Sequence, residues 1–240
     1  MKRLVDFTTQ FGLVSEVSAY SYSELNGLTL EKVFRLRKKV FIDEKQWTIG
    51  SYKGGDFECD DHDDDHSHYI ILTCDNALTG CVRLRPSIYP TLMSGTLHWL
   101  KEPVSPSLRS DETMWEATRF FVTSNKAGRK GPGGFAGRTQ ALFLGMIEFG
   151  IFKGFSSYEV VVDEAMARIV RMSGWQLEIL NSGLGTLNEN VYYGLLPCNV
   201  DALGEIIDTA ERRHIINPSS CLRSGSFISS SYAKLSSSLA

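Results

Sequence analysis

The sequence predicts an α/β (α+β) fold in which a mixed, twisted β-sheet carries helices on both faces. Short β-favouring segments and helical segments alternate loosely along the chain. One long helical segment, residues 135–153, divides the predicted strands into two groups. Because a sheet and its helices bury their apolar faces against each other, this order of elements is typical of a layered fold.

The first elements are a strand over residues 14–22 and a helix over residues 29–45. Thr29 is the predicted N-cap of this helix. Apolar side chains recur along it at helical spacing, which predicts one buried face. Arg37 falls on that apolar face, where a charged side chain needs an explanation.

Three strands are expected in the middle of the chain. Those over residues 69–74 and 79–85 are joined by a two-residue turn, and the third covers residues 114–122. A basic, glycine-rich segment, residues 126–134, then leads into the long helix.

The last third of the chain continues the alternation. We expect a strand over residues 158–162, a helix over 164–173, strands over 175–180 and 191–196, and an amphipathic helix over 201–213. Gly174 is the predicted end of its helix, because glycine readily takes the left-handed conformation there.

The composition is that of an ordinary globular chain. With 240 residues, 42% of them hydrophobic, it is long enough for one full core. We divide it into an N-terminal extension over residues 1–14, a single domain over residues 15–213 and a serine-rich tail over residues 214–240, which we expect to be disordered. The net charge of −3 offers no general attraction to nucleic acid.

Cysteine usage and hydropathy indicate the compartment. Five scattered cysteines without a C-x-x-C pair argue against a zinc site or a disulfide framework and suit a reducing cytoplasm. We expect no signal peptide, because no uninterrupted apolar segment follows the N-terminus. No stretch reaches about 18 consecutive apolar residues, so we expect no transmembrane helix. The expected location is cytoplasmic.

The most informative segment is the predicted strand that carries Glu116 and Arg119 among apolar and β-favouring residues. A charge in a buried strand lowers the stability of the fold unless it is paired with an opposite charge, and such a charge is often kept because it binds a substrate or takes part in catalysis. Because arginine pairs well with carboxylates, we expect these charges to meet others that fall near the core. The others are Arg37, Asp60, Asp63 and Arg83.

A structural ion-pair network would explain any single pair of these charges. Six groups from four segments favour a functional site, because a purely structural network of that size is costly. In a regular strand, residues 116 and 119 point to opposite faces. A shared site therefore requires a bulge or a strong twist between them.

An ordered set of motifs runs from about residue 15 to about residue 180. It consists of Arg37-x-x-Val40-Phe41, Trp47, Asp60-x-x-Asp63, Tyr69, Gly80-x-x-Arg83, Pro90-x-Leu92-Met93 and Trp115-Glu116-x-x-Arg119-Phe120. This set resembles the LuxI-type acyl-homoserine lactone synthases, the autoinducer synthase family. Every charged position of the family's signature is present in order.

The resemblance implies a fold similar to that of the GCN5-related N-acetyltransferases. It also implies an acyltransferase that moves an acyl chain from acyl carrier protein to the amine of S-adenosylmethionine. The methionine-derived part then closes into a lactone, and methylthioadenosine and holo-carrier protein are released. The product is a diffusible quorum-sensing signal. Both reactants are substrates, so no cofactor and no metal is implied, and we expect a monomer that meets its carrier protein transiently.

Two residues are assigned to catalysis. The amine must lose a proton as it attacks the thioester, and Glu116 is the candidate base, either directly or through water. Arg119 is assigned to the catalytic network without a separate role. Lactone closure is chiefly a matter of positioning the substrate carboxylate against the carbon attached to sulfur.

S-adenosylmethionine would be bound by the remaining charges and two aromatic residues. Asp60 and Asp63 suit its cationic groups. Arg37 or Arg83 would hold its carboxylate or orient the aspartates. An aromatic face near a sulfonium is favourable, and the aromatic residues assigned to this role are Phe41 and Trp47.

The acyl chain and the phosphopantetheine arm are assigned to a second set. Backbone amides near Phe120 and Phe121 would stabilise the thioester oxyanion, and the glycine-rich segment would cradle phosphate at a helix N-terminus or be only a solvated connector. The residues assigned to the acyl chain and the arm are Phe120, Phe121, Val122, Arg129, Gly134, Phe143, Met146, Val161 and Trp175. Plain core packing would also explain the apolar members. A basic patch for the acidic carrier protein is assigned to Lys126, Lys130 and Arg138.

The spacing of the acidic loop, the run of acidic residues over 56–65, leaves an alternative open. The gap from Trp47 to Asp60 is longer than usual in the family. The two assigned aspartates could therefore be replaced by others in the same run, which are Asp61, Asp64 and Asp65.

Two further details bear on the substrate and on metals. Residues 160–163 lack the threonine often present in makers of 3-oxo-acyl signals, which favours an unsubstituted acyl chain. His66 and His68 have metal-ligand side chains and could share a divalent ion. The competing interpretation is a solvated acidic loop from which two aspartates are recruited inward.

Two other functions fit parts of the sequence. Another acyl-CoA-dependent N-acyltransferase of the same fold would acylate an amine without releasing methylthioadenosine. A non-catalytic binding module would keep only the fold. The length and 3-position oxidation of the acyl chain, and the choice between acyl carrier protein and coenzyme A as donor, are left open by the sequence.

Overall fold

The computed structural model describes residues 2–8, 14–102, 113–123, 135–213 and 215. Within these ranges the framework is one mixed eight-stranded sheet with the order β1-β2-β3-β4-β5-β6-β8-β7. The β5–β6 pair is parallel and the other neighbouring pairs are antiparallel. The strands are β1 (Lys2–Thr8), β2 (Val14–Ser21), β3 (His68–Cys74), β4 (Ala77–Pro86), β5 (Met114–Val122), β6 (Ser157–Asp163), β7 (Glu178–Leu184) and β8 (Asn190–Pro197).

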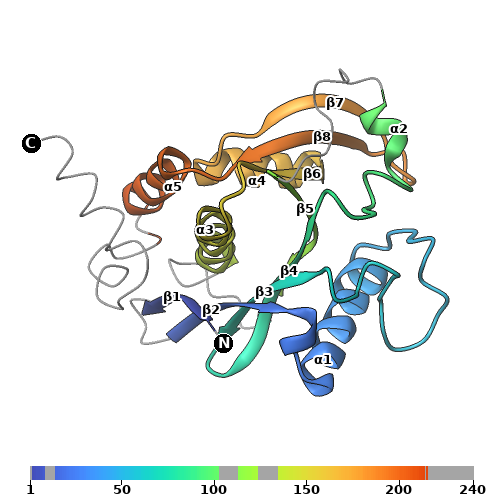
Figure 1. Ribbon diagram of the computed structural model, residues 1–240, viewed down its shortest axis with the longest axis horizontal. Helices are drawn as coiled ribbons and strands as arrows, with labels where there is room; N and C mark the ends of the chain where they lie inside the picture. Colours follow the sequence, from blue (N-terminus) through green and yellow to red (C-terminus); the bar gives the residue numbers. More distant parts are fainter. Residues whose placement is uncertain (1, 9–13, 103–112, 124–134, 214, 216–240) are drawn as a thin grey trace, which may run out of the picture.

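Helices cover both faces of this sheet. The long helix α3 (Phe135–Lys153) contacts β2, β3 and α5, and Figure 1 shows it between the N-terminal strands and the C-terminal helices. On the other side of β3 and β4, α1 (Gly27–Arg37) continues into a π-helical segment, η2 (Lys38–Glu44). The remaining helical elements are η1 (Tyr22–Glu24), α2 (His98–Lys101), α4 (Glu164–Ser173) and α5 (Val200–Arg212).

Alternate residues of β3 explain why the sheet needs cover on both sides. Ile70 and Leu72 belong to the large apolar core that contains the buried side chains of α3. Tyr69 and Ile71 belong to a smaller core that contains Val33 of α1. Successive strand residues point to opposite faces, so both faces of β3 are apolar and both are buried. The predicted mixed sheet with helices on both faces is confirmed.

Most predicted elements are present within a few residues, and three details differ. The predicted N-cap Thr29 is wrong: Asn26 caps α1, and its side chain accepts a hydrogen bond from the Thr29 amide at 2.8 Å. Strand β7 covers Glu178–Leu184 instead of residues 175–180, and Trp175 lies before it, fully buried in the core. Residues 2–8, assigned to an N-terminal extension, form β1 and pair with β2.

The division into extension, domain and tail stays a prediction. Of the predicted serine-rich tail, only residue 215 is among the described residues.

None of the helices in the described ranges is long and apolar enough to cross a membrane. The four cysteines found there are free thiols: Cys59, Cys74, Cys81 and Cys198.

Gly174 joins α4 to the core through a conformation that other residues rarely take. Its φ is 92°, and a Cβ there would meet Thr209 Oγ1 at 2.5 Å and the carbonyl oxygen of Glu205 at 2.6 Å. We expect Gly174→Ala to lower the free energy of unfolding by about 1–3 kcal/mol, the usual cost of such backbone strain. Urea denaturation followed by tryptophan fluorescence measures the change.

The matched control is Gly204→Ala, inside α5. A Cβ at Gly204 has no atom within 4 Å. Alanine is favoured over glycine in a helix by about 1 kcal/mol, so this variant is expected to be at least as stable as the parent chain. Equal stability of the two variants would contradict the role given to Gly174.

Candidate active site

The strands β5 and β6 form a fork in the middle of the sheet. They pair from Met114 to Glu116 and from Ser157 to Glu159, and their pairing stops there. A cavity of about 590 Å³ lies beyond that point, with both strands among its walls. The other walls come from η2 and the residues that follow it, from α2 and the segment before it, from helices α3 and α4, and from β8 and the β7–β8 turn. Of the predicted site residues, those that line the cavity are Phe41, Trp47, Glu116, Arg119, Phe120, Phe143, Met146 and Val161.

A bulge in β5 brings Glu116 and Arg119 to the same cavity. Arg119 has a φ of 56°, and the register of β5 with β4 shifts at this point. Ala117 lies in the α3-side core before the bulge, and Val122, an odd number of residues later, lies in the same core after it. The inserted residue thus reverses the alternation of the strand, as expected for a bulge. The predicted distortion is confirmed.

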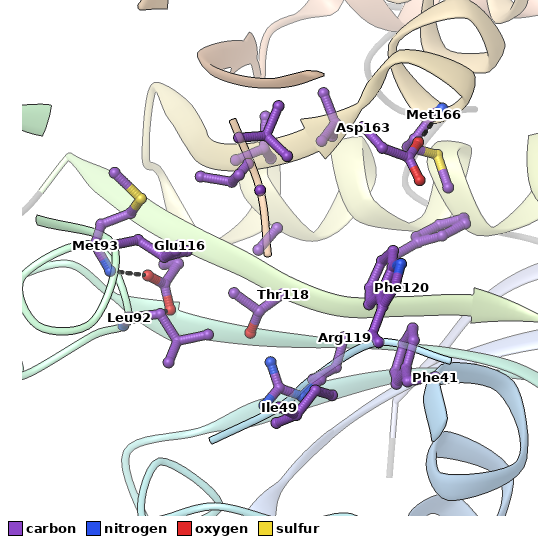
Figure 2. Close-up of a pocket in the computed structure, with 18 of the residues that line it drawn as sticks. Phe41, Ile49, Leu92, Met93, Glu116, Thr118, Arg119, Phe120, Asp163 and Met166 are labelled. Carbon is purple, nitrogen blue, oxygen red and sulfur yellow. Dashed lines mark hydrogen bonds between the residues drawn. The ribbon is translucent and has the colours of Figure 1, made fainter. Parts of the chain in front are cut away.

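Glu116 lies where the fork opens and is 1% exposed. Its Oε2 accepts a hydrogen bond from the amide of Met93 at 2.8 Å (Figure 2). Its Oε1 accepts a longer one from the amide of Leu92 at 3.3 Å. Burial raises the pKa of Glu116 above its ordinary value, although the two amides and Arg83 favour the charged form. A carboxylate of this kind at a cavity wall is suited to accepting a proton from a substrate.

Beneath the cavity, six side chains form a closed ionic ring of alternating charge. Each carboxylate pairs with two arginines, and three arginines balance three carboxylates, so the formal charge of the ring is zero. In order around the ionic ring, the members are Arg37, Glu58, Arg119, Asp60, Arg83 and Asp63.

Glu58 joins Arg37 to Arg119, and the sequence pattern did not single it out. Its Oε2 accepts from Arg37 Nε at 2.6 Å and its Oε1 accepts from Arg119 Nε at 3.1 Å. The side chain is fully buried. Counting charges could have found it. The three arginines of the ionic ring need three carboxylate partners, but the sequence offered only two aspartates besides Glu116, and Glu116 binds backbone amides.

The two aspartates predicted from the sequence close the ionic ring on its other side. Arg83 donates to both carboxylate oxygens of Asp60, and its Nη1 lies 3.0 Å from Asp63 Oδ1. The Tyr69 hydroxyl donates to that same oxygen at 2.7 Å. Burial disfavours the charge on Asp63, but the adjacent arginines outweigh it and hold the pKa of Asp63 below its ordinary value.

Of the six members, Arg119 lines the cavity, and its side chain is 12% exposed. Its Nη2 donates to Asp60 Oδ2 at 2.8 Å. Arg37, Asp60, Asp63 and Arg83 are not among the residues that line the cavity. Their direct contact with a substrate stays a prediction, and their geometry favours an orienting role.

The rest of the acidic loop has separate partners. Asp64, one of the alternative aspartates, binds Arg85 outside the ionic ring. His66 stacks on a tyrosine ring at 3.8 Å, whereas His68 packs among aromatic rings of β5 and α3. In the described ranges, no three His, Cys, Asp or Glu side chains are grouped so that they could hold a metal ion.

An aromatic shelf, made of Phe41 and Trp47, lies beside Arg119 in the cavity wall. The two rings stack at 5.3 Å with 7° between their planes. Lys45, which the sequence pattern did not single out, places its Nζ 4.4 Å from the Trp47 ring centroid and 3.6 Å from Asp163 Oδ2. A cation is therefore already accommodated on this aromatic face.

The residues assigned to the acyl chain separate into two groups. Phe120 packs on Phe143 with ring centroids 5.1 Å apart, and both line the cavity. Phe121 belongs to the α1-side core, whereas Val122 and Trp175 belong to the α3-side core. These last three do not line the cavity, and they support its walls from behind.

Arg138 lies near the start of α3 and is 7% exposed. Its Nε and Nη1 have no hydrogen-bond partner among the described residues. A buried guanidinium near a helix N-terminus, with two nitrogens that bind no described residue, suits an anionic ligand. The other predicted phosphate and carrier-protein residues lie outside the described ranges, and their roles stay predictions: Lys126, Arg129, Lys130 and Gly134.

Comparison with known proteins gives a consistent set of similarities. A family model described as autoinducer synthase matches residues 21–206. An acyl-homoserine-lactone synthase of Yersinia enterocolitica is 29% identical over 189 residues, which are 79% of this chain and 86% of that protein.

Solved structures show the same fold. A CoA-dependent acyl-homoserine lactone synthase, BjaI, with SAM and isopentyl-CoA, has a TM-score of 0.69 at 22% identity, over 82% of this chain and 90% of that chain. A Lactobacillus plantarum protein assigned as an N-acetyltransferase has a TM-score of 0.51 at 16% identity, over 77% of this chain and 99% of that chain. The fold is that of the acyl-homoserine lactone synthases and is similar to the GCN5-related N-acetyltransferase fold, as expected from the sequence.

Glu58 is predicted to be indispensable to the stability of the ionic ring. Glu58→Gln removes one charge and leaves Arg37 and Arg119 buried with a partner fewer. We expect the free energy of unfolding to fall by about 3–5 kcal/mol, the usual cost of breaking a buried ion pair from one side. Urea denaturation measures it.

Asp56→Asn is the control, because it breaks an ion pair of the same type at the surface. Asp56 lies 3.6 Å from Arg35, and both side chains are more than half exposed. Such pairs contribute about 0–1 kcal/mol, so this variant should resemble the parent chain. If the two variants lost equally little stability, the ionic ring would not have the structural role assigned to it.

Proposed function

The chain belongs to the autoinducer synthase family, and we propose that it makes an N-acyl-L-homoserine lactone from S-adenosylmethionine and an acyl-acyl carrier protein. The amine of S-adenosylmethionine is acylated first. The methionine-derived part then closes into a lactone, and methylthioadenosine is released. The observation that carries this proposal is the placement of Glu116, Arg119 and the aromatic shelf on one cavity at the β5–β6 fork.

Glu116 acts as the base for acylation. As the amine nitrogen bonds to the thioester carbon, its proton passes to Glu116 directly or through one water, and the thiolate of the donor arm leaves. The two backbone amides that bind Glu116 fix the direction of its carboxylate. Its raised pKa brings its proton affinity closer to that of the group it must deprotonate.

Arg119 and the aromatic shelf position S-adenosylmethionine. The ionic ring uses Nε and Nη2 of Arg119, which leaves Nη1 for the substrate carboxylate. The sulfonium lies against Phe41 and Trp47, where a cation is favoured. In lactone closure, a carboxylate oxygen bonds to the carbon attached to sulfur, and the sulfur leaves as the neutral thioether of methylthioadenosine. This step needs alignment and no proton transfer.

The donor is an acyl chain on a phosphopantetheine arm. Arg138 lies near the start of α3, and its Nε and Nη1, which have no partner among the described residues, would bind an anionic group of that arm. Its burial favours contact with a phosphate over contact with the surface of a carrier protein. Acyl carrier protein is proposed as the source because basic residues gather in the sequence of residues 126–130.

The proposed enzyme is a cytoplasmic monomer and uses no bound cofactor, since S-adenosylmethionine is consumed as a substrate.

Incubation of the chain with S-adenosylmethionine and acyl donors tests the function. Mass spectrometry is expected to find an N-acyl-homoserine lactone and methylthioadenosine in equal amounts. Parallel reactions with acyl carrier protein and with coenzyme A as the donor identify its source. Acylation without methylthioadenosine would show instead an N-acyltransferase of the same fold.

Substitution of Glu116 tests the proposed base. Glu116→Gln keeps the shape of the side chain but accepts no proton, so kcat should fall by about 10²–10⁴-fold, the usual contribution of general base catalysis. Glu31→Gln, on the exposed face of α1, is the control and should keep full activity. Unchanged turnover of Glu116→Gln, with native stability, would remove Glu116 from the mechanism.

A further inference from the structure

A second buried carboxylate, Glu159, lies beside the proposed base. Glu116 and Glu159 are register partners on the parallel strands β5 and β6, and they form the last pair before the fork opens. Glu159 has no exposed surface, and it is not among the residues that line the cavity. The mechanism above does not use it, so its burial needs another explanation.

Three side chains from three different parts of the chain bind Glu159. The Ser87 hydroxyl, just after β4, donates to Oε2 at 2.7 Å. The Tyr193 hydroxyl, in β8, donates to Oε1 at 2.8 Å. The Lys101 ammonium, in α2, forms an ion pair with the same Oε1. A charge that is bound from three sides at this depth has a fixed position.

These contacts converge on one part of the chain, residues 87–101, here called the wall segment. Its two ends, Ser87 and Lys101, bind Glu159. Its middle, the amides of Leu92 and Met93, binds Glu116. The wall segment lines the cavity with Leu92, Met93, Thr96, Leu97 and Trp99.

We infer that Glu159 is a positioning residue for the reaction: it fixes both ends of the wall segment, while Glu116 fixes the middle. The Ser87 amide donates to the Met114 carbonyl oxygen and Asn181 Nδ2 donates to the Leu100 carbonyl oxygen, so loss of Glu159 would loosen the ends without releasing them. The amides that orient Glu116 would shift with the loosened ends. This inference deepens the proposed function and rests on it, because Glu159 would act by holding the segment that orients the proposed base, Glu116.

Charge couples the two carboxylates as well as geometry. The charges that face Glu116 are Arg83 from β4, which favours its ionised form, and Glu159 from β6, which disfavours it. The groups that face Glu159 are Lys101 from α2 and Tyr193 from β8. Removal of the negative charge of Glu159 alone would lower the pKa of Glu116, whereas displacement of the Met93 and Leu92 amides, which hold that pKa down more strongly, would raise it. In Glu159→Gln the second effect should prevail, so the base becomes ionised only at higher pH.

The test compares pH profiles of kcat/KM for lactone formation. In Glu159→Gln the acidic limb should move to higher pH, and kcat/KM at neutral pH should fall by about 10–100-fold because the base is misplaced. Lys101→Met should also lower kcat/KM. The double variant should lose much less than the product of the two single losses, because both residues act on the same segment. The controls Glu31→Gln and Lys32→Met, on exposed positions of α1, make the same charge changes and should leave the profile unchanged.

Each outcome separates this inference from the proposed function. If the parent chain forms no lactone, the proposed function fails before any variant is compared. If the parent chain is active and the profile of Glu159→Gln coincides with it, the positioning role of Glu159 is wrong. A fall in activity with an unmoved acidic limb also overturns it, since general destabilisation would produce that result. If Glu159→Gln does not fold, Lys101→Met and Ser87→Ala decide: full activity of both contradicts the anchoring of the wall segment.

Discussion

The closed ionic ring is the constraint on which the rest of the site depends. It ties α1, the acidic loop, β4 and β5 together through buried charges that balance to zero. No member can be withdrawn without leaving a buried charge short of a partner, which is costly. The ionic ring therefore fixes α1 on the sheet, and with it the aromatic shelf at the cavity.

The same ionic ring explains a strained backbone at the centre of the site. A non-glycine residue with positive φ costs about 1–3 kcal/mol, and Arg119 takes this conformation in the bulge of β5. Its bonds to Glu58 and Asp60 offset that cost. The bulge in turn brings Arg119 to the cavity that Glu116 lines. The ion pairs of Arg119 thus stabilise the bulge, and the bulge places Arg119 at the cavity where the proposed reaction takes place.

Local pattern predicted those parts of the fold that local forces determine. β-branched and helical periodicities predicted β4, β5 and α3 closely, and the charge anomalies predicted five of the six members of the ionic ring. Glu58 was missed because it lies among other acidic residues, and the local sequence does not distinguish a buried carboxylate from its exposed neighbours. The pairing of β1 and the start of β7 depend on contacts with distant segments, so the local sequence could not indicate them.

A double-mutant cycle between Arg37 and Arg119 tests the ionic ring most directly. Both arginines bind Glu58 and belong to separate elements, α1 and β5. If the ionic ring acts as a unit, the losses in unfolding free energy of Arg37→Met and Arg119→Met will depart from additivity by about 1–3 kcal/mol. Additivity within about 0.5 kcal/mol would show that the arginines act independently, and would contradict the account.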